Sequence, residues 1–174
     1  WKLGEHWIKL WKKIYGDWAE SYSYLPQYFK EIKRRNSGAV GHIVHDEYRV
    51  FHRAFWAFGP SIAGYVHYRP VLSIDGTHLY GKYKGILLVA TAVDADDCLY
   101  PLAYGVVESE SYDSWAWFFS CMREFIYSVQ NRHITFISDR MKGIPSALQD
   151  KWREPHKNRL CARHLNQIFK LQVI

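Results

Sequence analysis

Two aspartates stand where short apolar runs of this sequence end. Asp75 follows the run 71–74, and Asp139 follows the run 133–138. Two close carboxylates disfavour each other's ionised form unless a cation neutralises them, and such oxygen ligands suit Mg²⁺. Divalent ions held there would favour phosphoryl displacement, a reaction of nucleic acids. A simpler interpretation also fits the spacing, in which Asp75-Gly76 is a turn and Asp139 caps a helix.

The aspartates converge only if the runs before them form neighbouring strands. Apolar runs at 71–74, 85–93 and 99–107 predict three strands joined as a meander. The middle run is apolar at nearly every position, which predicts a central strand covered by helices on both faces.

The meander is followed by a helical pattern, then a strand and a second helix. An apolar stripe of helical period from Trp115 to Val129 predicts the first helix, the run 133–138 predicts the strand, and Ile144 to Trp152 predicts the second helix. This order predicts an α/β fold with a mixed sheet and helices on both faces, as in ribonuclease H-like folds. A right-handed crossover would make the first and fourth strands parallel neighbours, with backbones about 5 Å apart.

The first part of the chain has a different pattern. Amphipathic spacing predicts one helix from Leu3 to Trp18 and a second that starts near Pro26 and is ended by the run 33–38. One or two strands follow within 42–58. We therefore expect a mainly helical N-terminal accessory, DNA-binding-like region over 1–69 and an incomplete catalytic core over 70–174.

The composition is that of a globular protein with one sizeable core. The 174 residues are 48% hydrophobic and carry a net charge of +6. The charge is uneven: 11 basic minus 6 acidic residues give +5 over 1–70, 4 minus 9 give −5 over 71–139, and 8 minus 2 give +6 over 140–174. This pattern suits a metal-binding acidic centre flanked by surfaces for a polyanion, although solvated basic faces would also account for it.

Three cysteines favour a reducing compartment, and no apolar run approaches the roughly 18 residues that cross a membrane. We therefore expect a soluble, intracellular protein without a membrane partner. The chain starts without methionine and stops inside an apolar run, so we expect a fragment of a longer protein.

Several motifs, in order, resemble the transposase domain of plant-type Mutator-like elements (MULE), a family of the DDE superfamily. The resemblance covers about residues 69–171. The motifs are RPVLSIDGTHLYGKYKG at 69–85, PLAY at 101–104, SW at 114–115, ISDR at 137–140 and CARHL at 161–165.

The resemblance implies a ribonuclease H-like core that cleaves and joins DNA strands with Mg²⁺ (or Mn²⁺), for transposition and DNA recombination in the nucleus. Asp75 and Asp139 match the first two family carboxylates, as catalytic and metal-binding residues. The third, a glutamate, is expected beyond Ile174, so this fragment alone is expected to be inactive. The implied partner is DNA, both transposon ends and target, and a homo-oligomer is left open.

Other residues of the core have less definite roles. Cys161 and His164 form the family's Cys-x-x-His motif, which by spacing is half of a zinc site and whose role stays open. Basic side chains near these motifs are expected to contact DNA phosphates. They are Arg140, Lys142, Arg159 and Arg163.

Glu108 and Glu110 precede the long helix, and we expect them to be solvated acids that interact favourably with its dipole. The alternative is a further metal-facing acid, which ribonucleases of this fold carry there. Two other functions are weighed: a domesticated, non-catalytic DNA-binding or transcription-regulatory derivative, and a cellular ribonuclease, which the Cys161-x-x-His164 motif disfavours.

Overall fold

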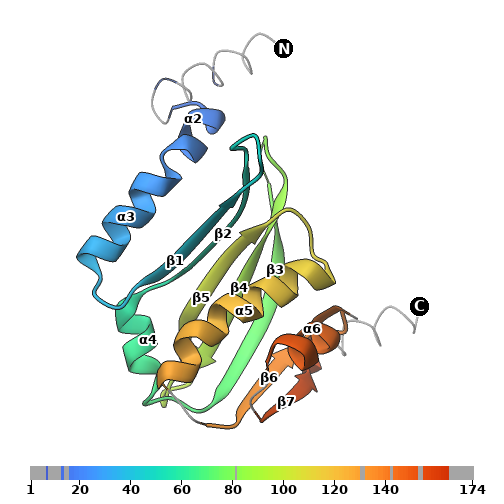
Figure 1. The fold of residues 1–174 in the computed structure, drawn as a ribbon. Coiled ribbons are helices and arrows are strands. Elements are labelled where there is room, and N and C mark those ends of the chain that lie inside the picture. Colours follow the sequence, from blue (N-terminus) through green and yellow to red (C-terminus); the bar gives the residue numbers. More distant parts are fainter. Residues whose placement is uncertain are drawn as a thin grey trace.

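The computed structural model describes Trp7, Lys13 and residues 16–80, 82–129, 132–141, 143–152 and 155–164. These residues form a mixed sheet of seven strands with packed helices (Figure 1). The predicted helix from Leu3 to Trp18 lies mostly outside the described residues.

The strand order is β1-β2-β5-β4-β3-β6-β7. All neighbours are antiparallel except β3–β6 and β6–β7, which are parallel, so the predicted parallel pairing of the first and fourth core strands is confirmed. The strands are β1 Val40–His45, β2 Phe51–Ala57, β3 Val71–Leu79, β4 Gly85–Val93, β5 Leu99–Val107, β6 Ile134–Ser138 and β7 His156–Leu160.

Helices pack on both faces of the sheet. Phe55 of β2 contacts Phe118 of the long helix, with ring centroids 5.5 Å apart, whereas the next residue, Trp56, contacts Phe29 at 6.0 Å. Successive strand residues point to opposite faces, so the helices carrying Phe118 and Phe29 lie on opposite faces. The helices are α2 Trp18–Ser23, α3 Leu25–Arg35, α4 Gly59–Tyr65, α5 Tyr112–Val129 and α6 Gly143–Lys151.

The central strand β4 is not equally covered on its two faces. Leu88, Ala90 and Ala92 are fully buried, on the face that α5 covers, but Leu87 and Val89 between them are only half-buried. The prediction of a strand buried on both faces is therefore right for the α5 face alone. On the other face, α3 packs over β1 and β2 at one side of the sheet, away from β4 (Figure 1).

The sheet differs from the prediction in the length of β3 and in the presence of β7, for which no strand was predicted. The β3 strand does not stop at Asp75 but pairs with β4 as far as Leu79, opposite Gly85, because the apolar β4 supplies a partner along the whole length. The polar segment of β7 lacks the apolar pattern that identifies strands, and it is held as a sheet edge by pairing with β6.

The predicted boundary at residue 69 does not coincide with a break in the sheet. The hairpin of β1 and β2 joins β5 through the pairs Ala54↔Val106 and Trp56↔Tyr104. The division into accessory region and core stays a prediction. Among the described residues, no helix has the length and apolar character required to cross a bilayer.

Candidate functional site

Asp75 and Asp139 occupy equivalent positions on adjacent parallel strands. The last pair between β3 and β6 is Ser73↔Ile137, and each aspartate lies two residues beyond it. Paired strands are about 4.8 Å apart, so both side chains leave the backbone at one level of the sheet. The strand register therefore brings the two predicted site residues together.

Local hydrogen bonds orient each carboxylate. The backbone N–H of Gly76 donates to Asp75 Oδ1 at 2.9 Å, and the N–H of Met141 donates to Asp139 Oδ1 at 2.9 Å. Asp75 is exposed and Asp139 half-buried, so solvent reaches the site from the Asp75 side.

Glu110 adds a third carboxylate that the sequence analysis assigned to solvent. A Cβ atom on Gly76 would lie 3.0 Å from Glu110 Oε1, so the glutamate lies against β3 at the residue that follows Asp75. Burial raises the pKa of Glu110, and the negative charges of Asp139 and, more weakly, Asp75 raise it further, while Trp115 and His78 oppose the rise. Glu110 is therefore a half-buried acid within electrostatic reach of both aspartates, and not a solvated one as expected.

Glu108 is not a freely solvated acid either. Arg53 of β2 donates to both of its carboxylate oxygens, with Nε 2.8 Å from Oε2, and His52 Nε2 lies 4.0 Å from Oε2. Burial acts to raise the pKa of Glu108, but the hydrogen bonds from Arg53 outweigh it and the pKa is lowered. The two glutamates thus point to different partners from one short segment.

The start of α5 fixes this segment against the aspartates. Ser111 Oγ accepts the N–H of Ser114 at 3.2 Å and caps the helix. The fully buried Trp115 places its indole Nε1 3.3 Å from Met141 Sδ, which connects α5 to the turn that follows Asp139. The segment that carries Glu110 and the turn that carries Asp139 are therefore held together by the contact between Trp115 and Met141.

The Cys-x-x-His motif begins where the third parallel strand ends. The N–H of Cys161 donates to the carbonyl of Ser138 at 2.7 Å, directly before Asp139. Both Cys161 and His164 are half-buried, and within the described residues the buried Nδ1 of His164 has no hydrogen-bond partner. The motif thus lies at the same edge of the sheet as the aspartates, and its role stays a prediction.

The predicted DNA-contacting residues are exposed where they are described. Arg140 follows Asp139, Arg159 lies on β7 opposite Ile137, and Arg163 lies in the short turn after β7. Lys142 lies outside the described residues. These three arginines lie near the C-terminal ends of β6 and β7. Their contact with DNA stays a prediction.

The donor chemistry of the site fits a hard divalent cation. Carboxylate oxygens are the ligands that Mg²⁺ takes, and it commonly uses one or two carboxylates with water completing the shell. Among the described residues, no three His, Cys, Asp or Glu side chains are close enough to form a complete site. The pair that fits is therefore Asp75 with Asp139.

Glu110 could not be identified from spacing alone. Acidic residues are common at helix starts, and nothing in the sequence pattern predicts that the segment after β5 packs against Gly76. The nearest signal is the glycine itself, since the lack of a side chain at position 76 leaves room for a carboxylate.

A family model described as the MULE transposase domain matches residues 71–168, from the first residue of β3 to beyond β7. The match includes Asp75, Asp139, Cys161 and His164. No curated protein was found to match the chain.

Proposed function

We propose a DNA-processing function for this chain, which belongs to the MULE transposase domain family. The proposed activity is that of a DDE-type enzyme with a ribonuclease H-like core, namely metal-dependent cleavage and transfer of DNA strands. The main observation behind the proposal is the alignment of Asp75 and Asp139. Each lies two residues beyond Ser73↔Ile137, the last pair of the parallel strands β3 and β6. With transposon DNA as substrate, the expected compartment is the nucleus.

Asp75 and Asp139 are the proposed ligands of Mg²⁺ or Mn²⁺. A bound divalent ion would supply a more acidic attacking oxygen and stabilise charge on the leaving oxygen. The residues of the chain hold the two carboxylates at one level of the sheet, and Trp115 and Met141 restrict how far Asp139 and Glu110 can separate. The third family carboxylate is proposed to be a glutamate beyond Ile174, and Glu110, which lies against Gly76, is proposed as an auxiliary acid near the pair.

The proposed DNA partner is supported by charge around this edge. Arg140, Arg159 and Arg163 are exposed on the segments that carry or flank the parallel strand ends. Lys and Arg at such positions bind phosphates by releasing condensed counterions. The acidic site and its basic surroundings together suit a phosphodiester bound across a metal.

Titration with Mn²⁺, followed through the EPR signal of the free ion, tests the metal site. Asp75→Asn and Asp139→Asn are each expected to weaken Mn²⁺ binding about tenfold or more, because each removes a charged oxygen donor. Glu110→Gln is expected to weaken it less, and Asp96→Asn, which changes an exposed turn aspartate, is the matched control.

The outcomes separate a metal-dependent enzyme from a non-catalytic DNA-binding derivative. Mn²⁺ binding that is lost in the aspartate variants, with circular dichroism unchanged, supports the metal-dependent enzyme. Absence of Mn²⁺ binding by the parent chain, or equal binding by all four variants, would contradict it and leave the non-catalytic DNA-binding derivative as the better description.

A further inference from the structure

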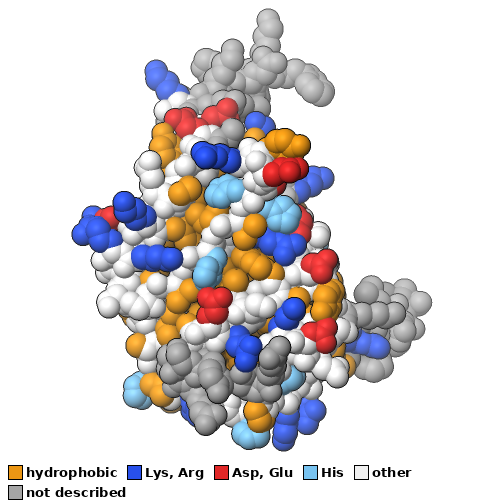
Figure 2. Space-filling model, viewed as in Figure 1, with side chains coloured by type: hydrophobic (Ala, Val, Ile, Leu, Met, Phe, Trp, Pro, Cys, Tyr) orange, Lys and Arg blue, Asp and Glu red, His pale blue; other side chains and the backbone are white. Residues whose placement is uncertain are grey.

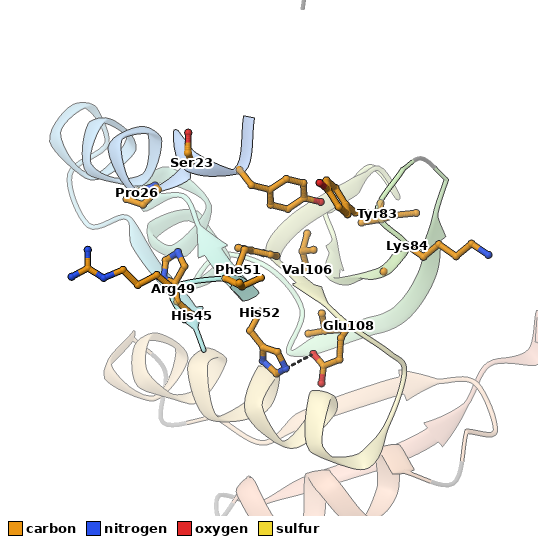
Figure 3. Close-up of a pocket in the computed structure, with 15 residues that line it drawn as sticks. Ser23, Pro26, His45, Arg49, Phe51, His52, Tyr83, Lys84, Val106 and Glu108 are labelled. Carbon is orange, nitrogen blue, oxygen red and sulfur yellow. Dashed lines mark ion pairs between the residues drawn. The ribbon is translucent and has the colours of Figure 1, made fainter. Parts of the chain in front are cut away.

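A second candidate site lies away from the carboxylates, between α2 and the tips of two hairpins. There the structure contains a cavity of about 930 Å³, bordered by α2, the β1–β2 turn, the β3–β4 turn and β5 (Figure 3). This volume lies within the range of pockets that enclose a small organic ligand, roughly 300–1,000 Å³. Of the residues described in the preceding site, Glu108 and its neighbour His52 also line it.

Aromatic side chains form one wall of this cavity. The ring of Tyr22 lies 4.9 Å from that of Phe51 and 5.4 Å from that of Tyr83, centroid to centroid, at interplanar angles of 56° and 88°. Tyr83 remains 42% exposed, so part of its ring is free to contact a ligand. A wall of this kind offers a stacking surface to a flat, partly apolar group.

Basic side chains lie on both sides of the aromatic wall. Arg49 and Lys84 are exposed, come from the two hairpin turns and extend in opposite directions in Figure 3. The acids close by are largely engaged: Asp46 Oδ1 accepts the N–H groups of Tyr48 and Val50, and Glu108 binds Arg53. Glu47 is the exposed acid of the same turn. The local field therefore favours a ligand with negative charge on two sides.

We propose that this cavity binds an unpaired nucleobase of a DNA strand, stacked on Tyr83, with Lys84 at a phosphate of that nucleotide and Arg49 at a phosphate farther along the strand. A base supplies the flat group, and phosphates of the same strand supply the negative charges. Base–aromatic stacking together with a basic surface is how proteins bind single strands without sequence preference. The inference rests on the proposed function only in taking DNA as the nucleic acid.

The cavity and the carboxylates lie along one strand. Leu79, which lines the cavity, is four residues from Asp75 on β3, or about 13 Å. This length corresponds to roughly four base steps of about 3.4 Å. On this proposal, the bound base belongs to the strand that passes the carboxylates, a few nucleotides away from them.

A single-stranded 12-mer with a central 2-aminopurine tests the proposal, in EDTA so that no metal contributes. Stacking quenches this fluorophore, so binding is expected to lower its emission. Tyr83→Ala is expected to weaken binding about fivefold or more, and Lys84→Gln to weaken it and reduce the salt dependence by roughly one phosphate contact. The matched controls are Tyr28→Ala and Lys151→Gln, which alter exposed residues outside the cavity.

Three results would overturn the proposal: no binding of the single strand, binding without quenching, or equal affinities for Tyr83→Ala and Tyr28→Ala. Tyr83→Phe keeps the ring and is expected to bind as the parent does, which separates loss of stacking from loss of folding. Failure here leaves the Mn²⁺ titration unaffected, and failure of Mn²⁺ binding leaves this assay unaffected, so the two proposals can fail separately.

Discussion

At the residue scale, the absence of a side chain at Gly76 leaves room for the carboxylate of Glu110 to lie against β3. A side chain at this position would begin 3.0 Å from Glu110 Oε1 and 3.1 Å from its Cδ. Contacts this short force the glutamate to move, and a glutamate side chain has the rotamers to do so. A side chain at position 76 is therefore expected to move the Glu110 carboxylate and to leave the backbone of β3 in place.

We predict that Gly76→Ala folds normally but binds Mn²⁺ more weakly, by no more than Glu110→Gln does and so by less than about tenfold, because Glu110 is displaced. Thr77→Ala, at the next and exposed position of β3, is the control and is expected to bind as the parent does. Mn²⁺ titration with thermal unfolding of both variants measures the effect. Unchanged affinity in Gly76→Ala would show that Glu110 has no part in holding the ion.

The residue types alone predicted that Asp75 and Asp139 lie at one level of the sheet, because each follows an apolar run that indicates a strand, and their metal-binding role stays a prediction. Glu110 was assigned to solvent, since its position depends on where the segment after β5 lies in space. The aromatic wall of Tyr22, Phe51 and Tyr83 was also missed, because its members come from three separate parts of the chain. Local patterns identify apolar strands, whereas only packing identifies which side chains lie against them.

At the scale of elements, the start of α4 is held by a very close backbone approach. A Cβ on Gly59 would lie 1.8 Å from the carbonyl oxygen of Ser37 and 3.2 Å from the backbone nitrogen of Ala39. Backbone atoms cannot rotate away as a side chain can. This approach fixes how α4 meets the turn between α3 and β1.

Gly59→Ala is therefore expected to destabilise the fold by about 1–3 kcal/mol or more, as overpacking does. The matched control is Ala63→Gly at an exposed position of the same helix, which should cost no more than about 1 kcal/mol through helix propensity. Urea unfolding followed by circular dichroism gives both values. A smaller effect for Gly59→Ala than for Ala63→Gly would mean that the turn can shift at little cost.

Elements with a strong apolar period were predictable, and those defined by their neighbours were not. The stripe of α5 and the apolar run of β4 appear in the structure close to their predicted bounds. The polar β7 carries no such pattern and exists as a strand through its pairs with β6. The inclusion of β1 and β2 in the main sheet depends on β5, more than forty residues later in the sequence.

At the scale of the whole molecule, positive charge is spread over separate surfaces. The last turn of α3 carries Lys33, Arg34 and Arg35, and Figure 2 shows Lys and Arg side chains over this part of the view. Arg34 and Arg35 both bind Glu31, which reduces their net field. Exposed Arg159 and Arg163 lie at the opposite side of the sheet, on and after β7.

We predict that duplex DNA binding falls steeply with salt, with a slope of log K against log salt of about −4 to −5 if roughly five phosphates are contacted. Arg159→Gln and Arg163→Gln are each expected to reduce the slope by about one, whereas Lys151→Gln is expected to leave it unchanged. Fluorescence anisotropy between 50 and 200 mM salt, roughly the range in which such binding changes most, measures it. Equal slopes in all variants would place the DNA elsewhere.

The ladder between β3 and β6 has three pairs, Val71↔Thr135, Leu72↔Phe136 and Ser73↔Ile137. Its middle pair is fully buried, so apolar packing sets the register that aligns Asp75 with Asp139. A substitution that loosens Phe136 would shift one carboxylate relative to the other and abolish cation binding with every ligand still in the sequence. Among natural copies of such a gene, an intact set of acids is therefore no guarantee of a working enzyme.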